Sequence, residues 1–361
     1  MKIHLSWAIV ASAFVLAAVV SSLWQVIQHL RHYNKPYLQK YIIRILWMVP
    51  IYSTNAWVAL LYPEIGLYLD VCRETFEAFV IYSFMKYLLN YLHYDLNLQQ
   101  TIDFKPGVNH VFPLCFLGTT KGGRLFMHRC KHGILQYVIV RPLTTLLAVL
   151  SQYIGVYGEG EYDLGKTYIY LLIINNISQL TAMYCLVIFY TGYKIELSGI
   201  KPLAKFLCIK LVVFFSFFQY VIISIMISLM RPNETIEKRL EEGRSVQDFL
   251  ICVEMLIASI AHHYAYSYHP FVETPLLDSK ESCFFAFLRS LDFTDDRNDV
   301  MDHIYQAVLK IKNGFRKSRN LPTVVVMENG DDMYEYTPLN TFNVGGVSST
   351  KSSYSALPSA I

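Results

Sequence analysis

Seven stretches of this chain are long and apolar enough to cross a lipid bilayer, and they limit its fold more than any other feature. A helix needs about 20 mostly apolar residues to cross the hydrocarbon core. Backbone groups must find their hydrogen bonds inside such a segment, which favours helices. We therefore predict an all-α, polytopic membrane protein with seven transmembrane helices. The predicted spans are Leu5–Ile27, Tyr41–Leu61, Ile65–Tyr91, Ile134–Tyr157, Tyr168–Tyr190, Phe206–Leu229 and Phe249–Tyr268.

The composition excludes an ordinary soluble domain, because 54% of the residues are hydrophobic and only 16% are charged. The first span has an alternative interpretation as a cleaved signal peptide, since small residues lie near its end. Its apolar stretch is longer than usual for such a peptide. Cleavage would also leave Arg31, Lys35 and Lys40 outside the cell. We therefore expect this span to be retained.

The orientation is indicated by the basic residues, which favour cytoplasmic loops. With the amino terminus outside, the cytoplasmic intervals 28–40, 92–133, 191–205 and 269–361 hold 20 Lys and Arg residues, against 6 in the external intervals. The last external loop carries the glycosylation sequon Asn233-Glu234-Thr235. We predict an external amino terminus, a cytoplasmic carboxyl terminus and glycosylation at Asn233.

Three regions are expected along the chain: a transmembrane domain at 1–269, a cytoplasmic segment at 270–319 and a disordered tail at 320–361. The middle region has acidic residues at Asp292, Asp295, Asp296 and Asp299, then a short amphipathic helix from Val300 to Ile311. A basic patch comes next at Lys310, Lys312, Arg316, Lys317 and Arg319, which could rest on anionic lipid or be solvated. Two tyrosine-x-x-hydrophobic sorting motifs, Tyr336 to Leu339 and Tyr354 to Leu357, indicate endocytic traffic.

Four charged residues lie inside the third span: Asp70, Arg73, Glu74 and Glu77. Their spacing of i, i+3, i+4 and i+7 places them on one side of a helix. An ionised group at the centre of a transmembrane helix costs about 2.5–3.5 kcal/mol even on lenient insertion scales. This face must therefore meet other helices, water or a polar path. We interpret it as part of a transport or gating network, with structural pairing of the charges as the alternative.

Other spans carry polar residues that could complete this network. They are Arg141, Asn175, Asn176, Gln179, Lys210, Glu254 and His262. The amides can also hydrogen-bond between helices, which is worth about 0.6 kcal/mol on average in membranes. Arg44, Lys86, Arg141 and Lys210 lie toward the cytoplasmic ends of their spans. They could form a positive well for an anion, or simply extend to the interface.

Enzyme and receptor classes find little support. The chain has no Gly-x-Ser-x-Gly, no His-Glu-x-x-His and no second aspartate in a Gly-x-Gly-Asp setting. It also lacks the Asp/Glu-Arg-Tyr and Asn-Pro-x-x-Tyr motifs of rhodopsin-like receptors. We expect no catalytic residues, no metal, no cofactor and no nucleic-acid partner. None of the seven cysteines lies in a predicted external loop, so a disulfide framework is not expected. Acylation of Cys115 and Cys130 stays open.

Several strings of residues resemble a known family. They are Tyr41-Ile-Ile-Arg-Ile-Leu-Trp-Met-Val-Pro-Ile-Tyr52, Asp70-Val-Cys-Arg-Glu74, Glu77-Ala-Phe-Val-Ile-Tyr82, Leu135-Gln-Tyr-Val-Ile-Val-Arg-Pro142, Ile174-Asn-Asn-Ile-Ser-Gln-Leu180 and Ala261-His-His-Tyr264. Together they are similar to the transmembrane protein 184 family, and to its C-type branch in particular, within the larger organic solute transporter alpha family. The resemblance runs from about residue 30 to about residue 310. Relatives carry a run of cysteines in the 110–120 loop, where this chain has only Cys115.

This resemblance implies a seven-helix organic solute transporter-like fold and facilitated movement of amphipathic anions such as steroid conjugates. The implied partners are membrane lipids, a small organic anion, and a single-span beta-type subunit or a second copy of the chain. The alternative is a non-transporting receptor or a scaffold for traffic or growth control. The expected location is the plasma membrane, endosomes or both.

Overall fold

The computed structural model describes residues 2–96, 107–111, 116, 118–120, 122–158, 163, 165–231, 235–272, 282–318, 323–326 and 332–335. The chain divides into two compact units, at residues 1–300 and 301–361. The first unit holds the long helices that align with the predicted spans.

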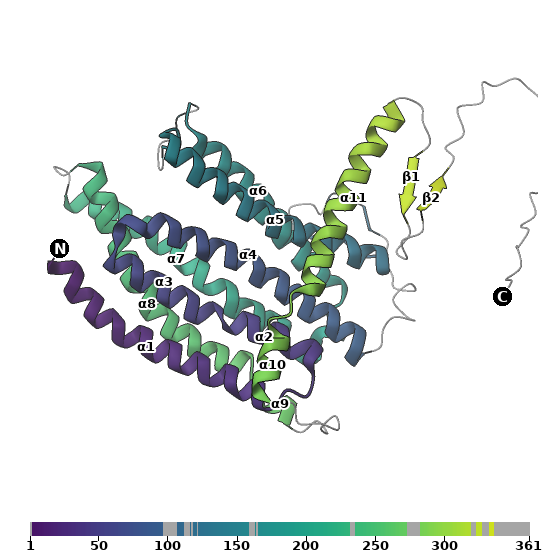
Figure 1. Cartoon of the computed structure of the whole chain (residues 1–361), viewed down its shortest axis with the longest axis horizontal. Helices are drawn as coiled ribbons and strands as arrows, with labels where there is room; N and C mark the ends of the chain where they lie inside the picture. The colour runs from purple at the N-terminus through teal and green to yellow at the C-terminus, as the bar shows by residue number, and fades with distance from the viewer. Residues whose placement is uncertain are drawn as a thin grey trace, which may run out of the picture. The chain divides into compact units, whose positions relative to one another are not determined.

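Long helices make up the first unit (Figure 1). They are α1 (Lys2–Arg31), α2 (Pro36–Leu46), α3 (Met48–Leu61), α4 (Gly66–Asn90), α5 (Arg124–Ile154), α6 (Thr167–Gly192), α7 (Pro202–Met230) and α8 (Ile236–Ala265). Shorter elements are η1 (Pro63–Ile65), η2 (Tyr91–Asp95), η5 (Glu196–Ile200), α9 (His269–Val272) and α10 (Cys283–Ser290). Helix α11 (Thr294–Ser318) begins in this unit and ends in the second.

Four of these helices are long and apolar enough to cross a membrane: Trp7–Arg31 of α1, α5, α6 and Glu241–Ala265 of α8. Helix α4 has the length, but its five charged residues lower its hydropathy. The second predicted span is divided between α2 and α3. The structure is thus that of a helical membrane protein, with helices along all seven predicted spans. The number of membrane crossings and the orientation stay predictions. Two helices begin ten or more residues earlier than predicted, α5 at Arg124 and α8 at Ile236.

The break between α2 and α3 comes from a proline. Pro50 has no N–H, so the carbonyl of Leu46, four residues earlier, loses its helical partner. The Ser22 hydroxyl on α1 donates a hydrogen bond of 3.0 Å to that carbonyl. Helix α1 packs against both α3 and α8. The polar group exposed by the proline is therefore satisfied by a neighbouring helix.

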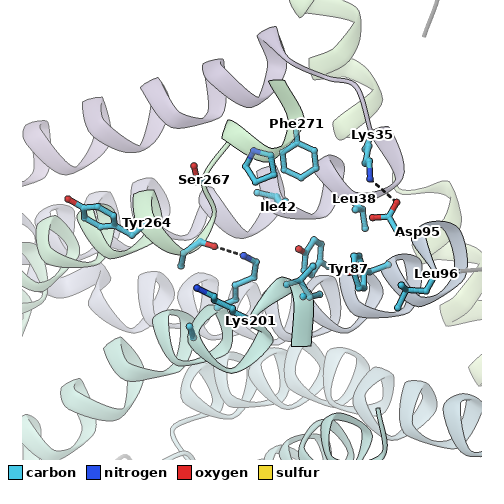
Figure 2. Close-up of a pocket in the computed structure, with 17 residues that line it drawn as sticks. Lys35, Leu38, Ile42, Tyr87, Asp95, Leu96, Lys201, Tyr264, Ser267 and Phe271 are labelled. Atoms are coloured by element: carbon cyan, nitrogen blue, oxygen red, sulfur yellow. Dashed lines mark hydrogen bonds and ion pairs between the residues drawn. The ribbon is translucent and has the colours of Figure 1, made fainter. Parts of the chain in front are cut away.

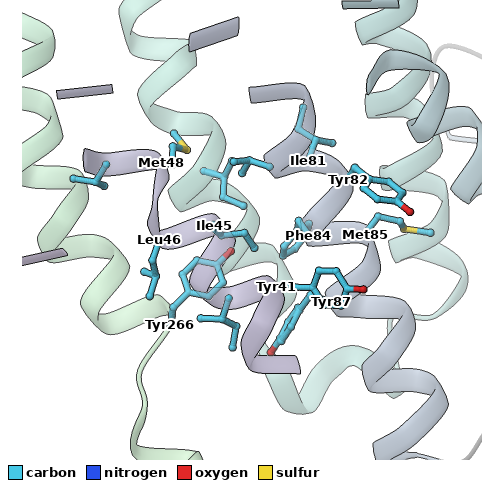
Figure 3. Close-up of a cluster of buried hydrophobic side chains, with 14 of the residues drawn as sticks. Tyr41, Ile45, Leu46, Met48, Ile81, Tyr82, Phe84, Met85, Tyr87 and Tyr266 are labelled. Carbon is cyan, nitrogen blue, oxygen red and sulfur yellow. The ribbon is translucent and has the colours of Figure 1, made fainter. Parts of the chain in front are cut away.

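An aromatic and aliphatic cluster joins α2, α3, α4 and α8 (Figure 3). Tyr41, Ile45, Tyr82, Phe84 and Tyr266 are each at most 1% exposed. Such large side chains can be almost fully buried because protein interiors pack as closely as organic crystals. The cluster holds these helices in a fixed arrangement, and the candidate site lies beside it.

The region after the last long helix differs from the expectation. Helix α11 begins at Thr294, six residues before the amphipathic run predicted at Val300–Ile311, and extends to Ser318. The tail expected to be disordered contains two short antiparallel strands, β1 (Thr323–Val326) and β2 (Asp332–Glu335). Three consecutive valines in β1 favour a strand because β-branched residues suit the extended backbone.

Candidate functional site

The charged face of α4 forms a row of ion pairs. Arg73 donates to Asp70 on the same helix at 2.6 Å. Glu74 accepts from Arg141 of α5 at 2.5 Å. One turn further along, Glu77 pairs with Lys210 of α7. The charged face of α4 therefore contacts partners on three helices: α4 itself, α5 and α7.

Burial differs along this row. Both side chains of the Glu77–Lys210 pair are nearly enclosed, at 10% and 13% exposed, whereas Asp70 is 44% exposed. Charges in a low dielectric need a partner, because an unpaired buried ion is far more costly than a paired one. The pairing satisfies the charges of α4 within the protein. Neither Glu77 nor Arg141 lines either of two cavities, one between α2 and α7 and one beside α2 and residues 289–299.

Hydrogen bonds between α5 and α6 use only part of the predicted amide cluster. Asn175 accepts from the Thr144 hydroxyl at 2.6 Å. Asn176 instead donates to the carbonyl of Leu172 on its own helix and is exposed. Gln179 is half-buried. Two further hydrogen bonds between these helices were not predicted from the sequence. The Gln136 amide donates to the Ser178 carbonyl, and the Ser178 hydroxyl donates to the Gln136 amide oxygen, both at 2.8 Å.

Arg44 of α2 holds the segment that comes after the last long helix. Its guanidinium donates to the Asp296 carboxylate at 2.6 Å and to the carbonyls of Ser290 at 3.1 Å and Asp292 at 2.5 Å. It also lies 4.5 Å from the ring centroid of Phe293. The Arg44 side chain is only 3% exposed. A buried arginine with this many donors in use fixes the backbone of residues 290–296.

Asp299 adds a second connection at the same end of the molecule. It accepts from Lys86 of α4 at 2.7 Å, from Lys131 of α5 at 3.2 Å and from the Tyr82 hydroxyl. Burial alone would raise the pKa of Asp299, but the two lysines and the hydrogen bonds hold it below its usual value. The four basic residues that could have formed a positive well, Arg44, Lys86, Arg141 and Lys210, each have a carboxylate partner.

A cavity of about 570 Å³ lies at the end of the helices that the sequence places in the cytoplasm (Figure 2). Its walls come from α2, the end of α4 with η2, the η5–α7 connection and the α8–α9 connection. Three lysines line it, Lys35, Lys201 and Lys205, against one carboxylate, Asp95. Since Lys35 binds Asp95 at 2.9 Å, the other two lysines give the cavity its positive charge.

Apolar and aromatic groups form the rest of the wall. They are Leu38, Ile42, Tyr87, Tyr91, Leu96, Ile200, Tyr264 and Phe271, together with small residues. Gly199 allows the Tyr91 hydroxyl to approach closely, since a Cβ at residue 199 would be only 3.1 Å from the hydroxyl oxygen. The combination of an apolar wall and two cationic groups suits a molecule with an apolar body and an anionic end.

Lys205 makes two contacts at the edge of the cavity. Its ammonium donates to the Ala265 carbonyl at 2.5 Å and lies 5.3 Å from the ring centroid of Tyr266. Lys205 precedes the predicted span 206–229. Burial lowers the pKa of Lys205 to about 8, and the charge of the nearby Lys201 acts in the same direction. An anion in the cavity would favour the charged form of this lysine.

Lys201 has an unusual backbone. Its φ of 47° places it in the left-handed region, where it precedes Pro202 at the first turn of α7. This conformation costs a non-glycine residue about 1–2 kcal/mol, and such strain is often found at functional sites. In the sequence, Lys35, Lys201 and Lys205 count only as cytoplasmic charge. Nothing in their spacing indicates that distant segments bring them to one cavity.

The remaining predicted residues are dispersed. His262 of α8 is 1% exposed and packs edge-on against Tyr266 at 5.7 Å. Glu254 lies half-buried on the same helix. Cys130 is buried at 3% exposed. Asn233, Cys115 and both tyrosine motifs, at Tyr336 to Leu339 and Tyr354 to Leu357, lie outside the described residues. Among the described residues, no cluster of three metal-ligating side chains occurs.

Comparison with known proteins places the long helices in one family. Residues 7–271 match the family described as organic solute transporter Ostalpha. Protein LAZ1 homolog 1 and Protein LAZ1 of Arabidopsis thaliana are 35% and 37% identical, each over 74% of this chain and 59% of its own length. A transmembrane protein 184 homolog of Dictyostelium discoideum is 35% identical over 73% of this chain and 52% of its own length. The chain thus spans a little over half the length of these relatives. No solved structure matches it.

Proposed function

Because this chain belongs to the organic solute transporter alpha family, we propose that it binds amphipathic organic anions and moves them across a membrane. The observation that carries the proposal is the lysine-bearing cavity. The names of the relatives specify no substrate. The choice of substrate class therefore depends on the chemistry of this site.

The cavity fits a small amphiphile in size and in charge. Its volume of about 570 Å³ lies within the range of roughly 300–1,000 Å³ found for ligand pockets. Lys201 and Lys205 would meet a carboxylate or sulfate, and Phe271, Tyr87 and Ile42 would cover the apolar part. The family resemblance points to the same class, with a conjugated steroid as the example.

The transport step would use the charged face of α4. An anion leaving the cavity toward the other side would meet Lys210 and then Arg141, each held by an α4 carboxylate. Movement through this region requires that these pairs open in turn, since Glu77 and Arg141 line neither cavity in the described structure. The remaining candidates, Asn175, Glu254 and His262, would line the path only after such a rearrangement.

A flux assay tests the transport proposal. Purified protein in liposomes, with and without a single-span beta-type partner, is exposed to a panel of labelled amphipathic anions that includes sulfated and conjugated steroids. Uptake above protein-free liposomes is expected for at least one anion. No flux for the whole panel under either condition would reject transport.

A binding assay tests the cavity separately. Lys201→Gln and Lys205→Met each remove one of the two lysine charges that the Lys35–Asp95 ion pair leaves in the cavity. Lys194→Gln is the control, because Lys194 is exposed and lies outside the cavity. Losing one desolvated contact to an anion should weaken binding of a sulfated steroid about tenfold. Thermal stabilisation by the steroid should fall in both cavity variants and persist in Lys194→Gln.

A second function is favoured by the closed row of ion pairs. A receptor or trafficking scaffold can pair its charges within a closed bundle, and the acidic row on α4 has partners throughout. In that case anion binding without flux is the expected result, and the Glu77→Gln variant should reduce abundance rather than transport. The flux and binding assays separate these functions, because only transport requires movement of solute.

The proposal includes a membrane arrangement. We propose seven crossings with the amino terminus outside, a glycan on Asn233, and residence in the plasma membrane or endosomes. Partners would be lipids and either a single-span beta-type subunit or a second copy of the chain. Protease applied to intact cells should spare an epitope placed after Pro270.

A further inference from the structure

Helix α10 has two unlike sides. Ala286 and Ser290 are buried, at 0% and 1% exposed, and Phe287 packs against the core. On the opposite side Phe284, Phe285 and Leu288 are 63%, 65% and 48% exposed. At 100° per residue, these three side chains fall within one arc that faces away from the buried arc. The exposed arc is therefore apolar and aromatic.

The position of α10 is fixed by the protein. It packs against α1 and α2. The carbonyl of Ser290, its last residue, accepts a hydrogen bond from the buried Arg44. Two other N–H groups of Arg44 donate to the Asp292 carbonyl and the Asp296 carboxylate, which hold the residues that follow α10. The exposed aromatic side is therefore presented in one direction by a rigid support, in contrast to an apolar residue on a loose chain end.

The surroundings of this helix identify what covers it. Helix α1 has the length and hydropathy of a transmembrane helix over Trp7–Arg31. Figure 1 shows α10 crossing α1 and α2 near the ends where α1 finishes and α2 begins. A helix that crosses a transmembrane helix at its end lies near the plane of the membrane surface. Its outward side then meets lipid, since lipid surrounds such a bundle laterally.

We propose that α10 is an in-plane helix whose aromatic side, Phe284, Phe285 and Leu288, inserts into the cytoplasmic leaflet of the membrane. Such helices bury their apolar side at the boundary between headgroups and acyl chains. A large exposed apolar patch on a protein surface marks an interaction site. Here the interaction is with the lipid surface, and the hydrogen bond from Arg44 to Ser290 fixes the depth of α10 relative to α2.

Apolar contact rather than charge carries this insertion. Arg289 is the one basic residue of α10, and the acids Asp292 and Asp295 lie nearby in the chain. Asp295 is already paired with Lys40 at 2.5 Å. With opposite charges so close, the helix has little net attraction for anionic lipid. Insertion should therefore occur in neutral phosphatidylcholine and persist at about 1 M salt, where charges are screened beyond about 3 Å.

Environment-sensitive labels test the proposal in the full-length protein. Single cysteines at Phe285→Cys and Leu288→Cys carry the fluorophore NBD, in a background where Cys72, Cys115 and Cys283 are replaced by Ser. Arg297→Cys is the matched control, because Arg297 is exposed on α11 only a few residues away. The labelled proteins are reconstituted into phosphatidylcholine liposomes with and without spin-labelled lipid.

The expected result is blue-shifted emission at positions 285 and 288 and about twofold quenching by lipid spin-labelled near the headgroup. The label at position 297 should show neither effect. Equal, water-like emission at all three positions would overturn the proposal. So would blue-shifted emission at 285 and 288 without lipid quenching, since a protein surface would then cover the helix. Loss of quenching at about 1 M salt would contradict the apolar mechanism.

Discussion

Removing the ammonium of Lys210 provides the sharpest test of the ion-pair row on α4. The variant Lys210→Met keeps much of the length of the side chain but leaves the carboxylate of Glu77 without its partner. Both side chains are nearly enclosed, at 13% and 10% exposed. Little water is available to replace the lost charge, so the remaining carboxylate is left buried without a partner, at a high cost in stability.

The size of the effect is set by this burial. Removing one partner of a buried ion pair costs about 3–5 kcal/mol of unfolding free energy. The Asp70→Asn variant is the control, because its pair with Arg73 lies within one helix and Asp70 is 44% exposed. Pairs of that kind contribute about 0.3–0.5 kcal/mol. The unfolding entropy is about 2.1 cal/mol/K per residue, so 1 kcal/mol shifts the melting temperature of a unit of about 300 residues by roughly 1.6 °C. Lys210→Met should therefore lower the melting temperature by roughly 5–8 °C and Asp70→Asn by less than about 1 °C.

The measurement is thermal unfolding of the detergent-solubilised protein, followed by fluorescence-detected size exclusion. The double variant Glu77→Gln with Lys210→Met completes the cycle. It should melt at a higher temperature than Lys210→Met alone, because no unpaired ion remains. Two results would refute the reasoning: a loss in Lys210→Met no larger than in Asp70→Asn, or losses in the double variant that equal the sum of the single ones.

Three further outcomes are expected. Anion binding in the cavity should weaken as the pH rises through about 8, because Lys205 loses its proton there; binding that is flat from pH 6 to 10, measured by thermal stabilisation, would argue against a role for this lysine. Asp299→Asn should destabilise the protein at pH 7. The difference from wild type should shrink as the pH falls below 3.8, because a carboxyl with a lowered pKa stabilises the fold above its unfolded-state pKa and loses that contribution when it is protonated. Melting curves from pH 3 to 7 test this. Endoglycosidase should shift the electrophoretic band of the expressed protein, and Asn233→Gln should abolish the shift; a tail epitope accessible on intact cells would contradict the orientation.

The fold class was readable from the sequence because it depends on local properties. Apolar length predicts helices that can cross a bilayer, and helices lie along each of the seven predicted segments. Periodicity likewise placed Asp70, Glu74 and Glu77 on one face, and the structure has all of them on the paired side of α4. The family could be recognised for a similar reason, since several long strings of residues occur in order within the matched range of residues 7–271.

Helix ends were less predictable. Hydropathy marks where a chain enters hydrocarbon, but a helix continues as long as its backbone bonds can form. Helix α8 therefore begins at Ile236, in a charged stretch, and α11 begins at Thr294, where Asp292 accepts from the Thr294 N–H. The α2–α3 division shows the opposite case, because the effect of Pro50 was predictable whereas the compensating Ser22 was not.

The pairing of charges and the cavity were decided by tertiary structure alone. Arg44 meets Asp296, 252 residues further along, and Lys210 meets Glu77, 133 residues away. The cavity draws Lys35, Lys201 and Lys205 from two separate connections and the start of α7. Periodicity fixes only the direction of a side chain on its own helix. Which opposite charge it meets depends on how distant helices pack, and that packing is a property of the whole bundle rather than of any segment.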